Sequence, residues 1–242
     1  MRTAAALIIG NELLTGKIQE ANVLTLARTL RQIGVQLRRV VMVLDEMDAI
    51  AGEVRALAAS HDVVFTSGGV GPTHDDVTIA AISRAFGVDA VRSPEIEETL
   101  RGYYKERLTD GHLAMAKVPE GARLARVQGG VWPAIVKDNV WILPGVPQIF
   151  AMKMPLVVAE LGSGHGWISL AVFTTLDEGD LKAKLDAVVE AHPDVEIGSY
   201  PTFVETRYRT KLTFDGLDTV AVNRARDAFV ASLPASVIVA GD

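Results

Sequence analysis

The chain has 242 residues, a formal net charge of −6 and no cysteine. This length fits one substantial domain together with a smaller one. The acidic balance argues against non-specific binding to nucleic acid or anionic membranes, because phosphate groups attract surplus Lys and Arg. The lack of cysteine excludes disulfides, thiolate metal sites and cysteine nucleophiles.

The amino-terminal stretch "MRTAAALIIGNELL" lacks the pattern of a secretion signal. No apolar run approaches the roughly 20 residues of a membrane-spanning helix. We therefore expect a cytoplasmic protein.

The first part of the chain alternates apolar runs with segments of helical periodicity. Each apolar run reads as a strand buried on both faces, and each periodic segment reads as a helix. Three such units in a row predict a parallel sheet with helices on its faces. The predicted strands are 3–10, 37–45 and 62–69, and the helices that follow them are 21–35, 46–60 and 75–87.

The alternation changes after Gly87. Ser93 and Pro94 predict the start of a helix, as N-cap and first helical residue. Short strand-like pieces then follow at 122–127, 133–136 and 139–145, of which we expect one to join the main sheet, and a helix is predicted over 146–161.

The glycine-rich stretch 162–166 predicts a linker before a second domain. The order of elements behind it is βαββαβ, which is typical of a ferredoxin-like fold. We expect domains over 1–161 and 167–242. The predicted elements of the second domain are 167–175, 177–192, 195–200, 205–214, 217–233 and 236–240.

The first candidate loop is "GNELLTGKIQEAN", residues 10–22. Ligands of an open parallel sheet bind outside the carboxyl ends of its strands, so the loops after the strands are the places to search. This loop is long for such a connection and carries Glu12, Lys17 and Glu20. The alternative is an ordinary solvated surface loop.

The second loop, "TSGGVGPTHDD", follows the third strand at residues 66–76. Its glycines allow backbone N–H groups to approach and bind an anion such as phosphate. Asp75 and Asp76 are expected at the first turn of the next helix, where one carboxylate suffices as a cap. The second aspartate then suggests a cation such as Mg²⁺. The loop matches neither the Walker A pattern nor G-x-G-x-x-G.

The third loop, "LPGVPQ" at 143–148, is a Pro-Gly turn that opens a helix. A rigid turn explains its prolines, and its place after a strand makes it a third wall of the same crevice. Trp132 and Trp141 are expected to pack or to shield an interface rather than to bind a ring. Met152 and Met154 are expected in the core or in an oligomer contact.

The three loops in this order resemble the MoaB/Mog, or molybdopterin-binding, domain family, and specifically its version at the amino terminus of CinA, the competence/damage-inducible protein. Residues 1–161 carry the resemblance, and the part from 162 is similar to the small domain that follows in short CinA-like proteins and in eukaryotic FAD synthase. The resemblance implies an α/β fold with a three-layer α/β/α, mostly parallel arrangement, and a smaller C-terminal α+β ferredoxin-like domain. It does not extend to the amidase domain of CinA.

The resemblance also implies roles for individual residues. Asp75, Asp76 and Glu12 would be catalytic, and Asp75, Asp76 and Glu20 would hold a divalent metal, Mg²⁺ or else Mn²⁺ or Co²⁺, with K⁺ as a further candidate cation. The residues implied in phosphate and substrate binding are Gly10, Asn11, Gly16, Asn22, Gly68, Gly69, Gly71, Pro72, Thr73, Pro144 and Gly145.

The leading functional hypothesis is a metal-dependent hydrolase, a pyrophosphatase of a nucleoside-diphosphate-linked substrate such as ADP-ribose or FAD. One alternative is a molybdopterin-binding or adenylyl-transfer protein of molybdenum cofactor synthesis. Another is a non-catalytic binder of nucleotide or pterin, since Asn11 and Glu20 stand where the family often has Asp. The expected partners are a small dinucleotide or pterin and further copies of the chain in a dimer or trimer.

Overall fold

The structure is a computed structural model that describes residues 2–126, 132–162, 166–204 and 207–240. The chain divides into two compact units, residues 1–164 and 165–242. Most of the expected linker, residues 163–165, lies outside the described residues. No helix in the described ranges is both long and apolar enough to span a membrane.

A six-stranded mixed sheet forms the centre of the first unit, in the order β2-β1-β3-β8-β7-β6. The first four strands are parallel, and β7 and β6 are antiparallel additions. Three strand-like pieces therefore join this sheet where one was expected. The strands are β1 (Thr3–Ile9), β2 (Gln36–Val43), β3 (Val63–Ser67), β6 (Arg123–Ala125), β7 (Ala134–Lys137) and β8 (Val140–Leu143).

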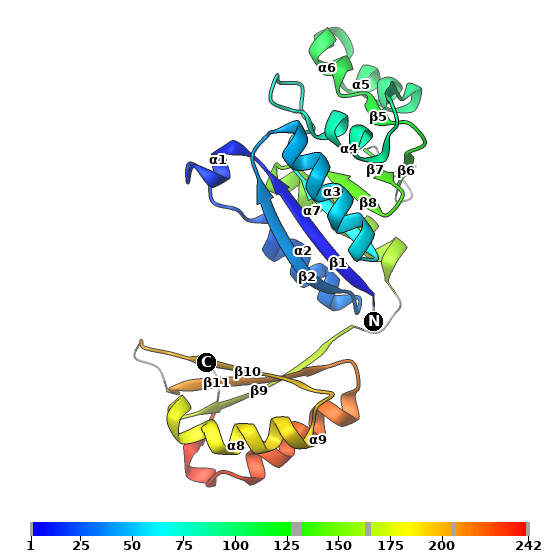
Figure 1. Cartoon of the computed structure of the whole chain (residues 1–242). Helices are drawn as coiled ribbons and strands as arrows, with labels where there is room; N and C mark the ends of the chain where they lie inside the picture. The colour runs from blue at the N-terminus through cyan, green and yellow to red at the C-terminus, as the bar shows by residue number, and fades with distance from the viewer. Residues whose placement is uncertain (1, 127–131, 163–165, 205–206, 241–242) are drawn as a thin grey trace. The chain divides into compact units, whose positions relative to one another are not determined.

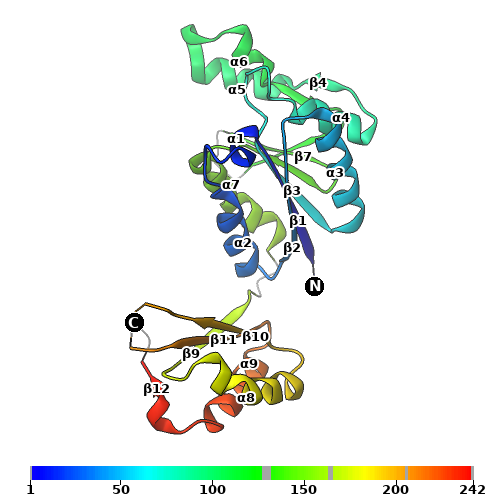
Figure 2. The ribbon, with the colours of Figure 1, turned by 60° about the vertical axis from the view of Figure 1, so that its left-hand side comes forward.

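Helices cover both faces of this sheet (Figures 1 and 2). Helices α2 (Asn22–Gln32) and α7 (Pro147–Leu161) pack on one face, and α3 (Met47–Ser60) and α4 (Thr78–Phe86) on the other. The central strand β1 is buried on both sides, because its alternate residues enter two different hydrophobic clusters. The expected three-layer α/β/α fold is confirmed.

A small subdomain extends the first unit between α4 and β6. Ser93 accepts a hydrogen bond from the Ile96 N–H, which confirms the predicted N-cap. The subdomain consists of β4 (Ala90–Arg92), α5 (Pro94–Tyr104), the 3₁₀ turn Lys105–Arg107, α6 (Asp110–Ala114) and β5 (Lys117–Pro119), with β4 and β5 antiparallel.

The second unit is the predicted βαββαβ fold. Its antiparallel sheet has the order β10-β11-β9-β12, and α8 and α9 pack on one of its faces (Figure 1). Phe214 and Phe229 are fully buried in this core, with ring centroids 5.6 Å apart. The elements are β9 (Ile168–Thr174), α8 (Glu178–Ala191), β10 (Glu196–Pro201), β11 (Thr210–Gly216), α9 (Thr219–Ala231), the 3₁₀ turn Ala235–Val237 and β12 (Ile238–Val239).

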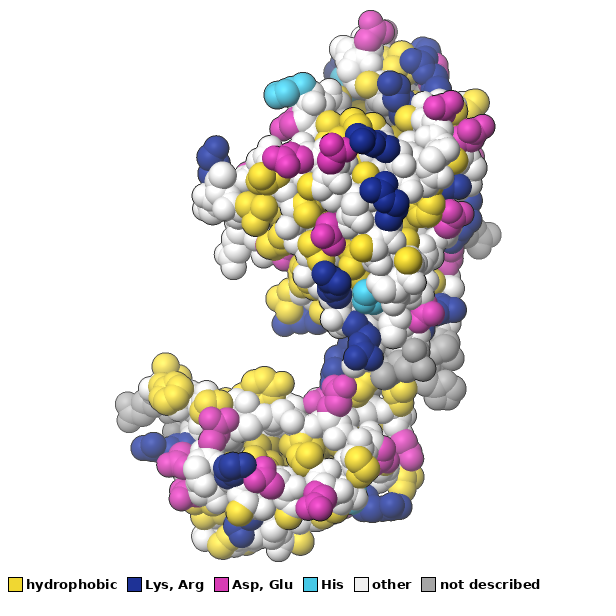
Figure 3. Space-filling view, in the orientation of Figure 1, with side chains coloured by type: hydrophobic (Ala, Val, Ile, Leu, Met, Phe, Trp, Pro, Cys, Tyr) yellow, Lys and Arg dark blue, Asp and Glu magenta, His cyan; other side chains and the backbone are white. Residues whose placement is uncertain are grey.

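The register of the parallel strands brings three loops together at the carboxyl ends of the strands of the large sheet. Ile8 of β1 pairs with Ser67 of β3, and Ser67 pairs with Leu143 of β8. The chain leaves all three strands at the same level, so the loops that follow them adjoin one another. Acidic and basic side chains are interspersed on the visible face of each unit (Figure 3).

Asn139, the residue before β8, connects this strand to the end of α3. Its side-chain amide donates to the carbonyls of Ala58, 3.0 Å away, and His61, 2.9 Å away, at the end of α3. This amide therefore fixes α3 against the sheet edge far from the loops.

Replacing Asn139 by Ala should lower the free energy of unfolding by about 1–3 kcal/mol, because two half-buried carbonyls lose their donor. Urea unfolding followed by circular dichroism measures this change. Asn223→Ala is the matched control, because in the described ranges the hydrogen bonds of its side chain stay within α9, to the Thr219 carbonyl and from Arg226. It should change stability by less than about 0.5 kcal/mol. Equal effects of the two changes would contradict this reading.

Candidate functional site

A pocket of about 580 Å³ lies where the three loops meet. Most of the residues expected to bind phosphate, substrate or metal line it, whereas Asn11 and Gly16 belong to the first loop without lining the pocket. The expected residues that line it are Gly10, Glu12, Glu20, Asn22, Gly68, Gly69, Gly71, Pro72, Thr73, Asp75, Asp76, Pro144 and Gly145.

The glycines of the second loop are required by its backbone path. Gly68 and Gly69 have φ of +110° and +64°, which side chains disfavour. A Cβ on Gly68 would lie 2.1 Å from the Ile9 carbonyl oxygen. Within the described part of the chain, the N–H groups of Gly69 and Val70 donate no hydrogen bond, and both residues line the pocket. They are therefore available to an anionic ligand.

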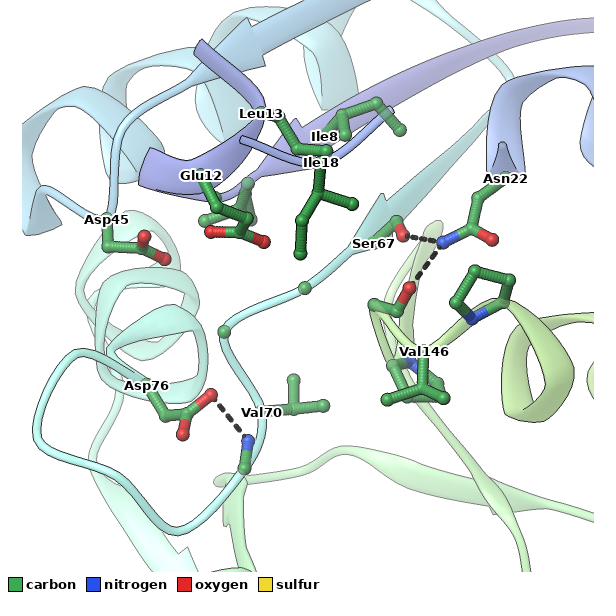
Figure 4. Close-up of a pocket in the computed structure, with 18 of the residues that line it drawn as sticks. Ile8, Glu12, Leu13, Ile18, Asn22, Asp45, Ser67, Val70, Asp76 and Val146 are labelled. Carbon is green, nitrogen blue, oxygen red and sulfur yellow. Dashed lines mark hydrogen bonds between the residues drawn. The ribbon is translucent and has the colours of Figure 1, made fainter. Parts of the chain in front are cut away.

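Asp76 fixes the shape of this loop. Its carboxylate accepts from the N–H group of Gly71 at 2.7 Å (Figure 4). It also accepts from the N–H group of Thr73 at 2.8 Å. The expectation that Asp75 or Asp76 caps the next helix is wrong, because α4 begins only at Thr78 and has no side-chain cap. The doubled aspartate precedes the helix in a separate turn, in which Asp76 serves the loop instead.

Asp75 lies beside the same threonine. The Thr73 hydroxyl is 2.6 Å from the Asp75 carboxylate and also contacts Asp76. Its hydrogen bond to Asp75 is the main cause that lowers the pKa of that carboxyl below its ordinary value. Asp75 is thus held ionised at the pocket rim.

Asp45 is a site residue that the sequence reasoning missed. It follows β2, lines the pocket, and accepts a hydrogen bond from the Asn11 N–H at 2.8 Å. Burial is the largest influence on its pKa and raises it; the charges of Glu12, Asp75 and Asp76 raise it further, against the Asn11 hydrogen bond. The signal was present in the sequence, since Asp45 ends the second predicted strand.

Glu12, Asp45, Asp75 and Asp76 together form what we term the acidic rim. In Figure 4 the carboxylates of Glu12 and Asp45 lie above the glycine loop, and that of Asp76 lies inside the bend of the loop. The four negative charges interact, as the pKa of Asp45 records. No Lys or Arg lines this pocket among the described residues. Among the same residues, no three His, Asp or Glu side chains form a ready-made metal cage.

Asn22 holds the three loops together from the other side. Its side-chain amide donates to the Ser67 hydroxyl at 2.9 Å and to the Gly145 carbonyl at 2.7 Å (Figure 4). Glu20 accepts from the N–H groups of Asn22 and Val23, at 2.6 Å and 2.9 Å. Glu20 therefore caps the start of α2, and its metal role stays a prediction.

The remaining wall of the pocket is apolar. Ile8, Leu13 and Ile18 line it from the first strand and loop, and Val146 faces them from the third loop (Figure 4). The side chain of Ile18 is exposed. The pocket therefore combines a polar loop, an acidic rim and an apolar wall, which suits a ligand with a flat ring and a phosphate.

A buried lysine lies beside the pocket on α7. Lys153 is 8% exposed, and its ammonium group donates to the carbonyls of Trp132, at 2.7 Å, and Pro133, at 2.9 Å. Burial, assisted by the charge of Arg126, lowers the pKa of Lys153 to about 8. Burial therefore destabilises the protonated form of Lys153 relative to the neutral form.

Comparison with known proteins gives relatives for both units. Residues 5–162 match the model described as a probable molybdopterin binding domain, and residues 167–242 match that of the FAD synthase middle domain. A protein of Archaeoglobus fulgidus is 33% identical, over 91% of this chain and 93% of its own length. A probable FAD synthase of Caenorhabditis elegans is 32% identical over 88% of this chain, which spans 46% of that protein.

A solved structure also resembles the first unit. The crystal structure described as the protein CinA with unknown function from Thermoplasma acidophilum is 30% identical, with a TM-score of 0.60. The match covers 66% of this chain and 98% of that one.

Replacing Gly69 by Ala should destabilise the protein more than replacing Gly87 by Ala. Both residues have nearly the same positive φ, but a Cβ on Gly69 would lie 2.2 Å from the Thr78 hydroxyl, whereas one on Gly87 meets nothing within 4 Å. Gly87→Ala should lower the free energy of unfolding by about 1–2 kcal/mol, and Gly69→Ala by at least about 1 kcal/mol more. Chemical denaturation compares the two; equal losses would show that the loop accommodates the methyl group.

The stability of the protein should rise between about pH 8 and pH 10 through Lys153. Lys153 has a pKa of about 8 in the folded protein and the ordinary pKa of 10.5 in the unfolded chain. Below pH 8 the folded protein carries the full cost of burying the charged ammonium group. Above pH 8 the folded protein loses this proton while the unfolded chain keeps it, so the free energy of unfolding rises. The gain should be about 1–3 kcal/mol relative to Lys153→Met. Denaturation at a series of pH values measures it, with the exposed Lys182→Met as control. Parallel pH curves for wild type and Lys153→Met would refute it.

Proposed function

The chain belongs to the family of probable molybdopterin binding domains over residues 5–162, and on that premise we propose that its pocket binds a phosphorylated pterin together with a divalent cation. The resemblance inferred from the three loops is thereby confirmed. The observation that carries the proposal is the presence, in one pocket, of the unused N–H groups of Gly69 and Val70 and of the acidic rim.

The glycine loop and the apolar wall of the pocket bind different parts of the proposed ligand. Phosphate oxygens accept from the Gly69 and Val70 N–H groups, which the Asp76 carboxylate holds in place through the rest of the loop. A flat ring lies on the apolar wall of Ile8, Leu13 and Ile18. A volume of about 580 Å³ is in the ordinary range for small-molecule sites.

The acidic rim explains why a cation belongs to the proposal. A phosphate near four carboxylates, with no basic side chain among the described lining residues, meets repulsion on the order of 1 kcal/mol or more for each close pair. A divalent cation removes this repulsion. Mg²⁺ commonly takes one or two carboxylates and completes its shell with phosphate oxygens and water, so a site without a full protein cage fits it.

Glu12 and Asp45 are the proposed ligands of this cation, with Asp75 beside them. The oxygens of Asp76 and Glu20 already accept backbone N–H groups, which leaves them less free than the sequence suggested. Mg²⁺, or Mn²⁺ or Co²⁺ in its place, supplies neutralisation of phosphate charge. K⁺ remains a candidate for a second, monovalent site.

Two reactions are open to a pocket of this composition. Adenylyl transfer to the pterin fits the family of the first unit. Hydrolysis of a diphosphate such as ADP-ribose or FAD is the second candidate, favoured by the acidic rim and by the likeness of residues 167–242 to the FAD synthase middle domain.

A dimer or trimer is also proposed, because Val146 and Met152 are 52% and 66% exposed beside the site.

One panel of assays separates these functions. The protein is incubated with ADP-ribose, FAD or NAD, and separately with molybdopterin and ATP, each with Mg²⁺, Mn²⁺ or Co²⁺, and products are identified by mass spectrometry. An adenylylated pterin supports transfer, and mononucleotide products support hydrolysis. Tight binding without any product supports the non-catalytic binder, and no binding in any arm rejects the proposal.

Asp45→Asn should change cation and phosphate binding in opposite directions. Loss of one carboxylate should weaken Mn²⁺ binding at least about tenfold, measured by electron paramagnetic resonance of free Mn²⁺. The same change should strengthen binding of pyrophosphate without metal, measured by calorimetry, because repulsion falls. Asp48→Asn is the control, since Asp48 is exposed on α3 and pairs with Arg84 at 2.6 Å. Unaltered Mn²⁺ affinity in Asp45→Asn would contradict the proposed cation site.

A further inference from the structure

A second cavity adjoins the pocket on the side of the small subdomain. It has a volume of about 430 Å³ and lies between α5, α7 and the residues before β7. We name it the aromatic cleft, after Tyr103, Tyr104 and Trp132 in its lining. The cleft and the pocket share four lining residues, namely Val70, Met115, Pro144 and Ile149.

The aromatic rings of the cleft stand at steep angles to one another. The ring of Tyr103 lies 5.0 Å from that of Tyr104, at 85°, and 5.3 Å from that of Trp132, at 72°. Edge contacts of this kind hold the rings in position without closing them into one stack. Tyr103 is 56% exposed and Trp132 37%, so apolar ring surface remains uncovered at the cleft.

Among the described residues that line this cleft, Lys153 is the charged one. It lines the cleft, and two carbonyls accept from its ammonium group. An ammonium group has three donors, so one remains for a ligand. In the described ranges no carboxylate pairs with Lys153, although its side chain is buried. A carbonyl oxygen or ring nitrogen of a ligand would accept from this remaining N–H group.

The shared residues place the cleft next to the phosphate-binding loop. Val70, whose N–H group is available to phosphate, lines both cavities. A phosphate at this loop would therefore lie next to both the pocket and the aromatic cleft.

We infer that the aromatic cleft binds a planar heteroaromatic ring, and that the ligand is a diphosphate with one ring in the pocket and a second ring in the cleft. The second ring packs against Tyr103 and Trp132 and accepts a hydrogen bond from Lys153 through a carbonyl or ring nitrogen on its edge. This inference rests on the proposed function, since it needs phosphate at the glycine loop. It assigns a ring subsite to Tyr103, Trp132 and Lys153, which lie outside the three loops of the pocket.

The test compares a two-ring ligand with a phosphate that has no ring. Calorimetry measures the affinities of FAD and of pyrophosphate, both with Mg²⁺, for the full chain. Wild type should bind FAD at least about tenfold more tightly than pyrophosphate. Tyr103→Ala and Lys153→Met should each weaken FAD about five- to twentyfold, within the range for loss of a stacking partner, and should leave pyrophosphate within twofold.

Tyr200→Ala is the matched control, because Tyr200 is 55% exposed and lies in the second unit. Circular dichroism confirms that each variant is folded, and the exposure of Tyr103 makes its replacement mild. The inference is overturned if FAD binds no more tightly than pyrophosphate, if Tyr103→Ala leaves FAD affinity unchanged, or if it weakens both probes equally. Failure of wild type to bind either probe instead rejects the proposed function.

Sedimentation of the same variants tests whether another copy of the chain occupies the cleft. If Tyr103→Ala dissociates an oligomer while FAD affinity is kept, the cleft is an interface and the ring site is rejected. If the oligomeric state is unchanged and FAD affinity falls, the assignment of a ring to the cleft is supported.

Discussion

The hydrogen bonds of one carboxylate determine the shape of the site. Asp76 accepts from the N–H groups of Gly71 and Thr73, and so bends the loop after β3 back on itself. Gly71 and Thr73 are committed to Asp76, whereas Gly69 and Val70 line the pocket and their N–H groups donate no hydrogen bond within the described residues. Charge-assisted bonds of this kind are the stronger class in proteins. The proposed binding of phosphate by this loop thus depends on an acid that itself would touch no phosphate.

The same acid creates the electrostatic problem of the site. Its charge adds to those of Glu12, Asp45 and Asp75, and the raised pKa of Asp45, which burial causes first, reflects their proximity. Anion-binding N–H groups and an anionic rim oppose each other unless a cation stands between them. The site is therefore suited to an anionic ligand that binds together with a cation. The net charge of −6 of the whole chain agrees with this.

Local patterns predicted the elements of this protein better than the connections between them. Buried strands and N-caps such as Ser93 were readable, because burial and capping depend on residues close in sequence. The addition of β6 and β7 was missed, because antiparallel pairing of three- and four-residue strands depends on tertiary contacts. One of Asp75 and Asp76 was expected to cap the next helix, because only the structure shows that α4 starts later. Asp45 was missed because its neighbours come from other loops.

Thr78, the first residue of α4, joins the glycine loop after β3 to the body of the first unit. Its N–H group donates to the Gly69 carbonyl at 3.0 Å, and its hydroxyl donates to the Gly68 carbonyl at 2.9 Å. The loop is thus ordered by folding, and its conformational entropy is not lost again when a ligand binds. Affinity can then respond to small changes in ligand chemistry, because little of the interaction energy is spent on arranging the receptor.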